Sequence, residues 1–283
     1  MNILIDKETK WYHQYPKIIG TFGKKGEGVL PNTNVYQEKM MINKGHLKAY
    51  NSLIGYKDNN FISPTYLHIL AMPAHLALLT DKNCPYPLMG AIHLSNQIKQ
   101  YRSLQTDEPF SIMVAFGAQK AHDKGQAYEV ITKIHVGEEK IWEESSTFLH
   151  KGKPGIGTAI DIIPEAKHPT FEEKWELSSN MGLQYARVSG DFNPIHLNII
   201  TAKIMGMNRP IIHGMYSKAR ALRYFCGTNR QEAIEIGTSF KVPISLPSSV
   251  RLRSESTKDK QILFDIMNNE SIKPHLRGYI SIL

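Results

Sequence analysis

Residues 185–196 read YARVSGDFNPIH, and their composition predicts a helix that ends in a polar turn. Pro194 has no backbone N–H to donate and disfavours the α conformation for Asn193, so a helix cannot continue through this stretch. We therefore expect Asp191 and His196 to lie on a bent loop directly after a helix. A carboxylate and an imidazole on a loop held by a rigid scaffold can take a proton from one atom and return it to another. The stretch predicts an acid–base site.

Two short patterns occur twice, in the same order, along the chain. Residues 50–55 (YNSLIG) match residues 185–190 (YARVSG) at an offset of about 135. Residues 91–94 (AIHL) match residues 233–236 (AIEI) at an offset of about 142. Each half is therefore predicted to contain a helix ending at glycine, a loop, a second helix and several strands. The loop of the second half is the longer one, and it contains the acid–base turn.

Apolar periodicity predicts the second helix of each half. In the second half, apolar side chains recur at gaps of three and four and form one stripe: Ile212, Met215, Ala219, Leu222 and Cys226. In the first half, residues 67–80 are apolar nearly all round, as expected of a buried helix. Pro73 would then fall in the first turn of the helix proper, where proline is tolerated.

β-favouring side chains predict four strands after each of these helices. The expected ranges are 91–104, 109–121, 126–136 and 139–150 in the first half, and 233–245, 248–257, 260–268 and 274–282 in the second. The glycine-rich residues 151–157 predict a linker between an N-terminal repeat (residues 1–150) and a C-terminal repeat (residues 151–283). Helices and strands in this order predict an α+β fold, in which each repeat wraps an antiparallel sheet around one long central helix.

The chain has 283 residues, a formal net charge of +8 and no dense run of lysine or arginine. A nucleic-acid-binding protein would concentrate such charge in a basic stripe, so we expect no nucleic-acid partner. A mildly positive field suits a ligand that carries phosphates, although a soluble basic protein explains the charge equally well. Five basic side chains follow the acid–base turn, and we expect them to form a solvated face rather than a phosphate channel: Lys203, Arg209, Lys218, Arg220 and Arg223.

Several further classes of protein are disfavoured by the sequence. No run approaches the roughly 18 apolar residues of a membrane helix. Residues 1–10 do not resemble a signal peptide, so we expect a cytoplasmic protein. The two cysteines, Cys84 and Cys226, have no metal-ligand spacing, and we expect them to be small buried side chains. The glycine-rich residues 20–28 lack the spacing of a phosphate-binding loop and predict an ordinary loop.

Residues 185–215 carry the pattern of a known family. An aromatic residue and a short spacer are followed by SGDFNPIH at 189–196, by small residues at 202 and 206, and by RPIIHGM at 209–215. In these motifs and their spacing the chain resembles the MaoC-like (R)-specific enoyl hydratase and 3-hydroxyacyl dehydratase family, of double hot-dog type. The resemblance implies two fused hot-dog repeats, with antiparallel sheets each wrapped around a central helix. The first repeat would be degenerate, because residues 55–58 (GYKD) stop short of the motif.

The resemblance also implies an activity and the residues that carry it. The activity is the reversible hydration of trans-2-enoyl thioesters to (R)-3-hydroxyacyl thioesters, with Asp191 and His196 as the catalytic pair. The Gly214 N–H, at the start of a helix, would bind the enolate oxygen, and the missing side chain would let the thioester approach closely. Four further residues would shape or orient the loop: Asn193, Ser189, Gly190 and His213. The family implies no metal or redox cofactor, takes an acyl-coenzyme A or acyl-carrier-protein substrate, and leaves a homodimer open.

The residues by themselves leave alternatives open. Asp191 could merely cap a turn, His213 could merely satisfy a buried carbonyl group, and Ser189 could be either a neighbour of the helix cap or a wall of the site. Tyr50 and Tyr185 are expected to be packing residues rather than acids. A thioesterase of the hot-dog fold and a non-catalytic acyl-thioester-binding subunit are the competing functions, because a fold does not fix a function.

Overall fold

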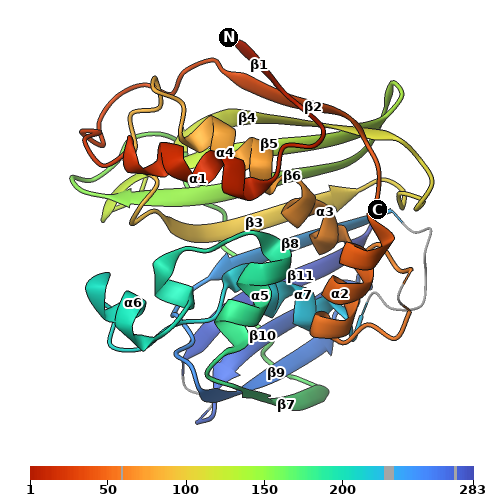
Figure 1. The fold of residues 1–283 in the computed structure, drawn as a ribbon. Helices are drawn as coiled ribbons and strands as arrows, with labels where there is room; N and C mark the ends of the chain where they lie inside the picture. The colour runs from red at the N-terminus through yellow and green to blue at the C-terminus, as the bar shows by residue number, and fades with distance from the viewer. Residues whose placement is uncertain (59, 226–232, 271–272) are drawn as a thin grey trace. The chain divides into compact units, whose positions relative to one another are not determined.

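The computed structural model describes residues 1–58, 60–225, 233–270 and 273–283, and the chain divides into two compact units (Figure 1). Unit 1 comprises Met1–Ile42 and Leu70–Ile162, and unit 2 comprises Asn43–Ile69 and Ile163–Leu283. Residues 43–69 precede the linker in the sequence, yet they fold with the C-terminal part of the chain. The predicted division into two sequence repeats, at residues 150 and 151, is a different boundary from that of the compact units, and it stays a prediction.

Unit 1 is a sheet with helices on one face (Figure 1). Its strands, in the order in which they pair, are β1 (Asn2–Ile5), β2 (Asn34–Met40), β4 (Phe110–Lys120), β5 (Gly125–Val136), β6 (Glu139–Lys151) and β3 (Ile92–Gln100). β1 runs parallel to β2, and the other neighbours are antiparallel. α4 (Met72–Leu79) lies against β2 and β4, and α1 (Trp11–Ile19) packs on α4. The sheet and α1 thus enclose a helix whose side chains are buried nearly all round.

Unit 2 contains five strands that pair antiparallel throughout, with helices on one face (Figure 1). Its strands pair in the order β8 (Ile234–Phe240), β11 (Pro274–Ile282), β10 (Ile262–Asn268), β9 (Ser248–Ser256) and β7 (Phe171–Leu177). Its helices are α2 (Lys44–Ile54), α5 (Met181–Ser189), α6 (Ile199–Ile204) and α7 (Gly214–Leu222), and α3 (Pro64–Leu70) belongs to it except for the last residue. β9 and β11 alternate buried and more exposed side chains, so one face of the sheet builds the core.

The eight strands expected from the sequence are confirmed as β3 to β6 and β8 to β11. β8 ends at Phe240, earlier than expected, because Pro243 has no N–H to give to a sheet. β1, β2, β7, α1 and the short α6 escape prediction. β7 shows why: it reads FEEKWEL at the edge of its sheet, and its charged side chains hide the alternation of the buried Trp175 and Leu177.

The apolar residues 67–80 form two helices rather than one, because the chain breaks at Ala71 between α3 and α4. Pro73 lies in the first turn of α4, as predicted. The central helices are shorter than expected, since α4 has 8 residues and α7 has 9. The apolar stripe of α7 is buried as predicted, apart from Cys226, which lies outside the described residues.

The solvated basic face is a wrong expectation for Lys218. This side chain is fully buried on α7, and its Nζ donates to the carbonyl oxygen of Ile236 at 3.2 Å. Arg220 lies over the ring of Trp175, 4.7 Å from its centroid, while Lys203 and Arg209 are exposed. A buried lysine can share the apolar side of a helix when its ammonium reaches a backbone oxygen.

Three smaller expectations are confirmed. Tyr50 and Tyr185 are buried packing residues, and Cys84 is a buried free thiol. Residues 20–28 form turns and loop. Within the described ranges, no helix combines the length and apolar character needed to cross a membrane.

The N-cap of α2 gives a test of this local structure. The side chain of Asn43 accepts a hydrogen bond from the His46 N–H at 3.0 Å, so Asn43→Ala should lower the free energy of unfolding by about 1 kcal/mol. Asn180 occupies the N-cap position of α5 without such a bond, so Asn180→Ala should change it by less than about 0.5 kcal/mol. Urea denaturation followed by circular dichroism measures both, and equal losses would contradict the role of the cap.

Candidate active site

The end of α5 sets the position of Asp191. Gly190 adopts a left-handed conformation with φ of 76°, and its N–H bonds to the carbonyl oxygen of Ala186 at 2.9 Å. A residue with a side chain would be strained there, so glycine lets the helix end sharply. The Asp191 N–H then donates to the hydroxyl of Ser189 at 3.2 Å. Ser189 is buried and acts on the backbone of the loop, which supports its interpretation as a neighbour of the helix cap.

The loop after Asp191 is held by a short series of turns. The Asn193 N–H donates to Asp191 Oδ1 at 3.2 Å, and the Ile195 N–H donates to Asn193 Oδ1 at 3.4 Å. Asn193 thereby caps the 3₁₀ turn Pro194–His196. At its end, His196 Nδ1 lies 2.7 Å from the carbonyl oxygen of Ile211. A carbonyl can only accept, so Nδ1 carries the proton and Nε2 keeps a free lone pair.

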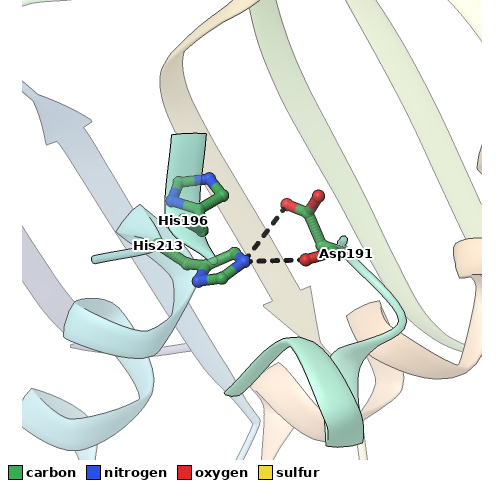
Figure 2. A group of neighbouring side chains, drawn as sticks. All are labelled: Asp191, His196 and His213. Carbon is green, nitrogen blue, oxygen red and sulfur yellow. Dashed lines mark hydrogen bonds and ion pairs between the residues drawn. The ribbon is translucent and has the colours of Figure 1, made fainter. Parts of the chain in front are cut away.

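His213, directly before α7, lies beside both Asp191 and His196 (Figure 2). Its Nε2 donates to the main-chain oxygen of Asp191 at 2.9 Å and lies 3.8 Å from Asp191 Oδ2. Its ring stacks on that of His196, with centroids 3.6 Å apart and planes at 25°. His213 therefore donates to a buried carbonyl group, as one of the two interpretations of the sequence expected. The same ring also packs against the ring of His196.

The protonation states follow from burial and from these neighbours. Burial alone would raise the pKa of Asp191, but His213, His196 and the Asn193 N–H outweigh it and hold this pKa below its usual value. His68, buried on α3, adds to that effect. Burial lowers the pKa of His196, and burial together with the adjacent His196 lowers the pKa of His213 to about 3. At neutral pH the site therefore holds one carboxylate, whose side chain is 39% exposed, beside two neutral imidazoles.

Gly214 begins α7, where the first N–H groups of a helix have no partner within the helix. The structure gives a reason for glycine here that differs from the expected close approach of a thioester. A Cβ at this position would lie 2.7 Å from ring atoms of Phe240, so the glycine lets α7 pack tightly on β8. The N–H remains at the positive end of the helix dipole.

Three contributors to the site escape prediction from the sequence: Gly182, Ile211 and His68. Gly182 lies within α5, and a Cβ there would be 2.1 Å from the carbonyl oxygen of His196. A glycine inside a predicted helix was the one available signal, because such a residue usually marks a close approach. Ile211 acts through its carbonyl group and His68 comes from the first half, so neither is visible in a local motif.

Asp191, His196 and His213 also form the kind of group that can hold a metal ion, with one ligand atom each and all three within 4.8 Å of one another. The hydrogen bonds argue against that use. His213 Nε2 carries a proton and donates it in the hydrogen bond to the Asp191 main-chain oxygen, so the lone pair of the ring lies on Nδ1. Nδ1 is buried and has no hydrogen-bond partner among the described residues. Binding through Nε2 would move the proton to that buried nitrogen, at a cost. The residues fit proton transfer better than metal binding.

An α+β hot-dog fold with an Asp–His turn beside its central helix defines the class of protein. The sequence profile of the MaoC like domain matches residues 163–276. The 3-hydroxyacyl-thioester dehydratase X of Mycobacterium tuberculosis is 30% identical over 225 residues, which cover 79% of this chain and 80% of the relative. The crystal structure of HtdX from the same organism has a TM-score of 0.76 at 27% identity and covers 88% of this chain and 100% of that chain.

A probable enoyl-CoA hydratase 2 of Dictyostelium discoideum is 24% identical over 162 residues, 52% of this chain and 55% of the relative. The chain therefore belongs to the MaoC-like dehydratase family and is a hydro-lyase. The resemblance and the α+β hot-dog fold predicted from the sequence are both confirmed.

Gly182→Ala tests the support of the turn that contains Asp191 and His196. A Cβ 2.1 Å from the His196 carbonyl oxygen must displace the turn, so we expect activity on an enoyl thioester to fall about 10- to 100-fold while far-UV circular dichroism is retained. Gly23→Ala is the matched control, because a Cβ there meets nothing within 4 Å. Equal activities of the two variants would contradict this role of Gly182.

Proposed function

We propose that the chain catalyses the reversible hydration of trans-2-enoyl thioesters to (R)-3-hydroxyacyl thioesters, with Asp191 and His196 as the catalytic pair. One observation carries the assignment: an ionised carboxylate adjoins a neutral imidazole whose Nε2 is free to accept a proton. The names of the relatives, a thioester dehydratase and an enoyl-CoA hydratase, support the same chemistry.

The proton transfers balance across this pair. As the water oxygen bonds to C3 of the enoyl group, His196 Nε2 takes one of its protons and the Asp191 carboxylate accepts a hydrogen bond from the other. The electrons of the C2=C3 bond move towards the thioester carbonyl and give an enolate. The imidazolium returns its proton to C2, so water has added across the double bond and both groups regain their starting states. Such acid–base catalysis contributes about 10²- to 10⁴-fold.

The enolate oxygen needs a donor aimed at it. We assign this role to the Gly214 N–H, at the positive end of the α7 dipole. Ser189, Gly190, Asn193 and His213 orient the loop and its two reacting groups. The Gly190 N–H closes the end of α5 on the Ala186 carbonyl. The other three residues each make a hydrogen bond to the loop backbone, and these contacts support the assignment.

The finer assignments stay predictions. The substrate is an acyl thioester, with coenzyme A and a carrier protein both open, and a homodimer is open as well. We propose a cytoplasmic location, which the buried free thiol of Cys84 supports because it suits a reducing compartment. A thioesterase would need a water aimed at the thioester carbonyl instead of C3, and no specific observation favours it.

Removing either reacting group tests the assignment. Asp191→Asn keeps the shape and removes the charge, and His196→Ala removes the base, so each should lower turnover of crotonyl-CoA at least about 100-fold. Loss of enoyl absorbance measures the reaction, and circular dichroism checks that the fold is kept. Loss of fold together with activity would favour a structural turn, and thiol release by the wild type would favour a thioesterase.

The pH dependence offers a separate test. His196 must be neutral to accept a proton, and burial places its pKa below the ordinary value of 6.5. The pKa of Asp191 is lowered too, so it stays ionised. We therefore expect kcat/KM to stay level from about pH 8 down to pH 6.5 and to fall only at lower pH. An acidic limb centred at or above pH 6.5 would contradict a buried neutral imidazole.

A further inference from the structure

α2 comes from the repeat without the catalytic motif, yet it folds into unit 2 against α5 and α7 (Figure 1). It is built like α5, since both helices end at a left-handed glycine, Gly55 with φ of 92° and Gly190 with φ of 76°. Where α5 leads into Asp191, α2 leads into a loop that lacks the acid–base turn. α2 therefore leads to no reacting group of its own, and its contacts within unit 2 decide what it can do.

His46, in the first turns of α2, makes the contact to α5. Its Nε2 lies 2.8 Å from the carbonyl oxygen of Val188, and its Nδ1 lies 2.9 Å from the hydroxyl of Tyr66. A carbonyl accepts, so Nε2 is the donor, and the tyrosine hydroxyl donates to Nδ1. Tyr66 is fully buried on α3. The ring therefore bridges a buried hydroxyl and the end of α5, with a hydrogen-bond partner for each ring nitrogen.

Val188 occupies the last turn of α5, where carbonyl groups have no partner within the helix. The next residues make the bonds that aim the loop: the Ser189 hydroxyl accepts from the Asp191 N–H, and the Gly190 N–H closes the helix. A group that fixes the Val188 carbonyl thus fixes the peptide from which this turn starts. Imidazoles are suited to this place, because donors are favoured at helix C-termini.

The other end of α2 is tied to α7. Arg223, directly after α7, donates from Nη1 to the carbonyl oxygen of Ile54 at 3.4 Å. A Cβ on Gly55 would lie 2.1 Å from that same Nη1. α2 is therefore held at one end to the helix that precedes Asp191 and at the other to the helix that begins at Gly214.

We propose that His46 is a positioning residue for the catalytic loop. Its ring connects the Val188 carbonyl to the buried Tyr66 hydroxyl. It thereby fixes the end of α5 and hence the direction in which Asp191 faces His196. This inference rests on the proposed function. It gives the repeat without the motif a defined part in catalysis: its helix supports the loop of the other repeat. His46 itself touches no substrate, because both ring nitrogens serve the support.

Two substitutions separate the two bonds of His46. His46→Asn places an amide near the position of Nδ1, so it keeps an acceptor for Tyr66 but is too short to reach Val188. His46→Gln places its amide nitrogen near the position of Nε2, so it keeps the donor to Val188 but loses the Nδ1 acceptor. Each variant loses one hydrogen bond, so a merely structural role predicts similar effects of both on melting temperature and on turnover.

Positioning through Val188 predicts a difference in kcat. We expect His46→Asn to lower kcat about tenfold or more and His46→Gln to keep it within about threefold, with KM changed by less than about threefold in both. His168→Ala, an exposed histidine of unit 2, is the control and should match the wild type. Equal kcat values for the Asn and Gln variants would overturn the proposal.

A readout without substrate keeps this test apart from the proposed function. Amide hydrogen exchange at residues 189–191 should be faster in His46→Asn than in His46→Gln and the wild type. Absence of turnover by the wild type on short, long and carrier-linked enoyl thioesters would refute the proposed function alone. Equal exchange in the two variants would refute the support by His46, whatever the turnover.

Discussion

The hydrogen bond from His213 Nε2 to the main-chain oxygen of Asp191 is the contact on which the site depends. It fixes the tautomer of a buried ring and joins the start of α7 to the end of α5. A neutral His213 can stack on His196 at 3.6 Å, whereas a charged ring there would repel the proton that His196 takes up in the proposed mechanism. Burial and the adjacent His196 lower the pKa of His213 to about 3, so this ring stays neutral at neutral pH.

Close backbone approach is the second constraint. Gly182 lets the carbonyl of His196 approach α5, and Gly214 lets the start of α7 pack on Phe240 of β8. Both glycines lie at the first or second position of a helix, where the entropic cost of glycine is offset by packing that no larger residue permits. The acid–base pair therefore owes its geometry to main-chain groups as much as to side chains.

The first half of the chain contributes helices to unit 2 rather than chemistry. α2 supports the end of α5 through His46, and His68 on α3 contributes to the lowered pKa of Asp191. The end of α5 needs such a neighbour, because the last carbonyl groups of a helix have no partner within the helix.

Local chemistry in the sequence predicted most of the elements and the residues that we propose to react. Pro194 and Gly190 ended the helix, periodicity placed α4 and α7, and the spacing of Asp191 and His196 indicated the acid–base turn, because each depends on residues a few positions apart. Tertiary structure alone decided what those residues meet. His46 and Val188 are 142 positions apart, and Phe240 and Gly214 lie on different elements. Such contacts follow from how the chain folds back on itself, which no local pattern records, and they fix the tautomers, the buried charge and the direction of the loop.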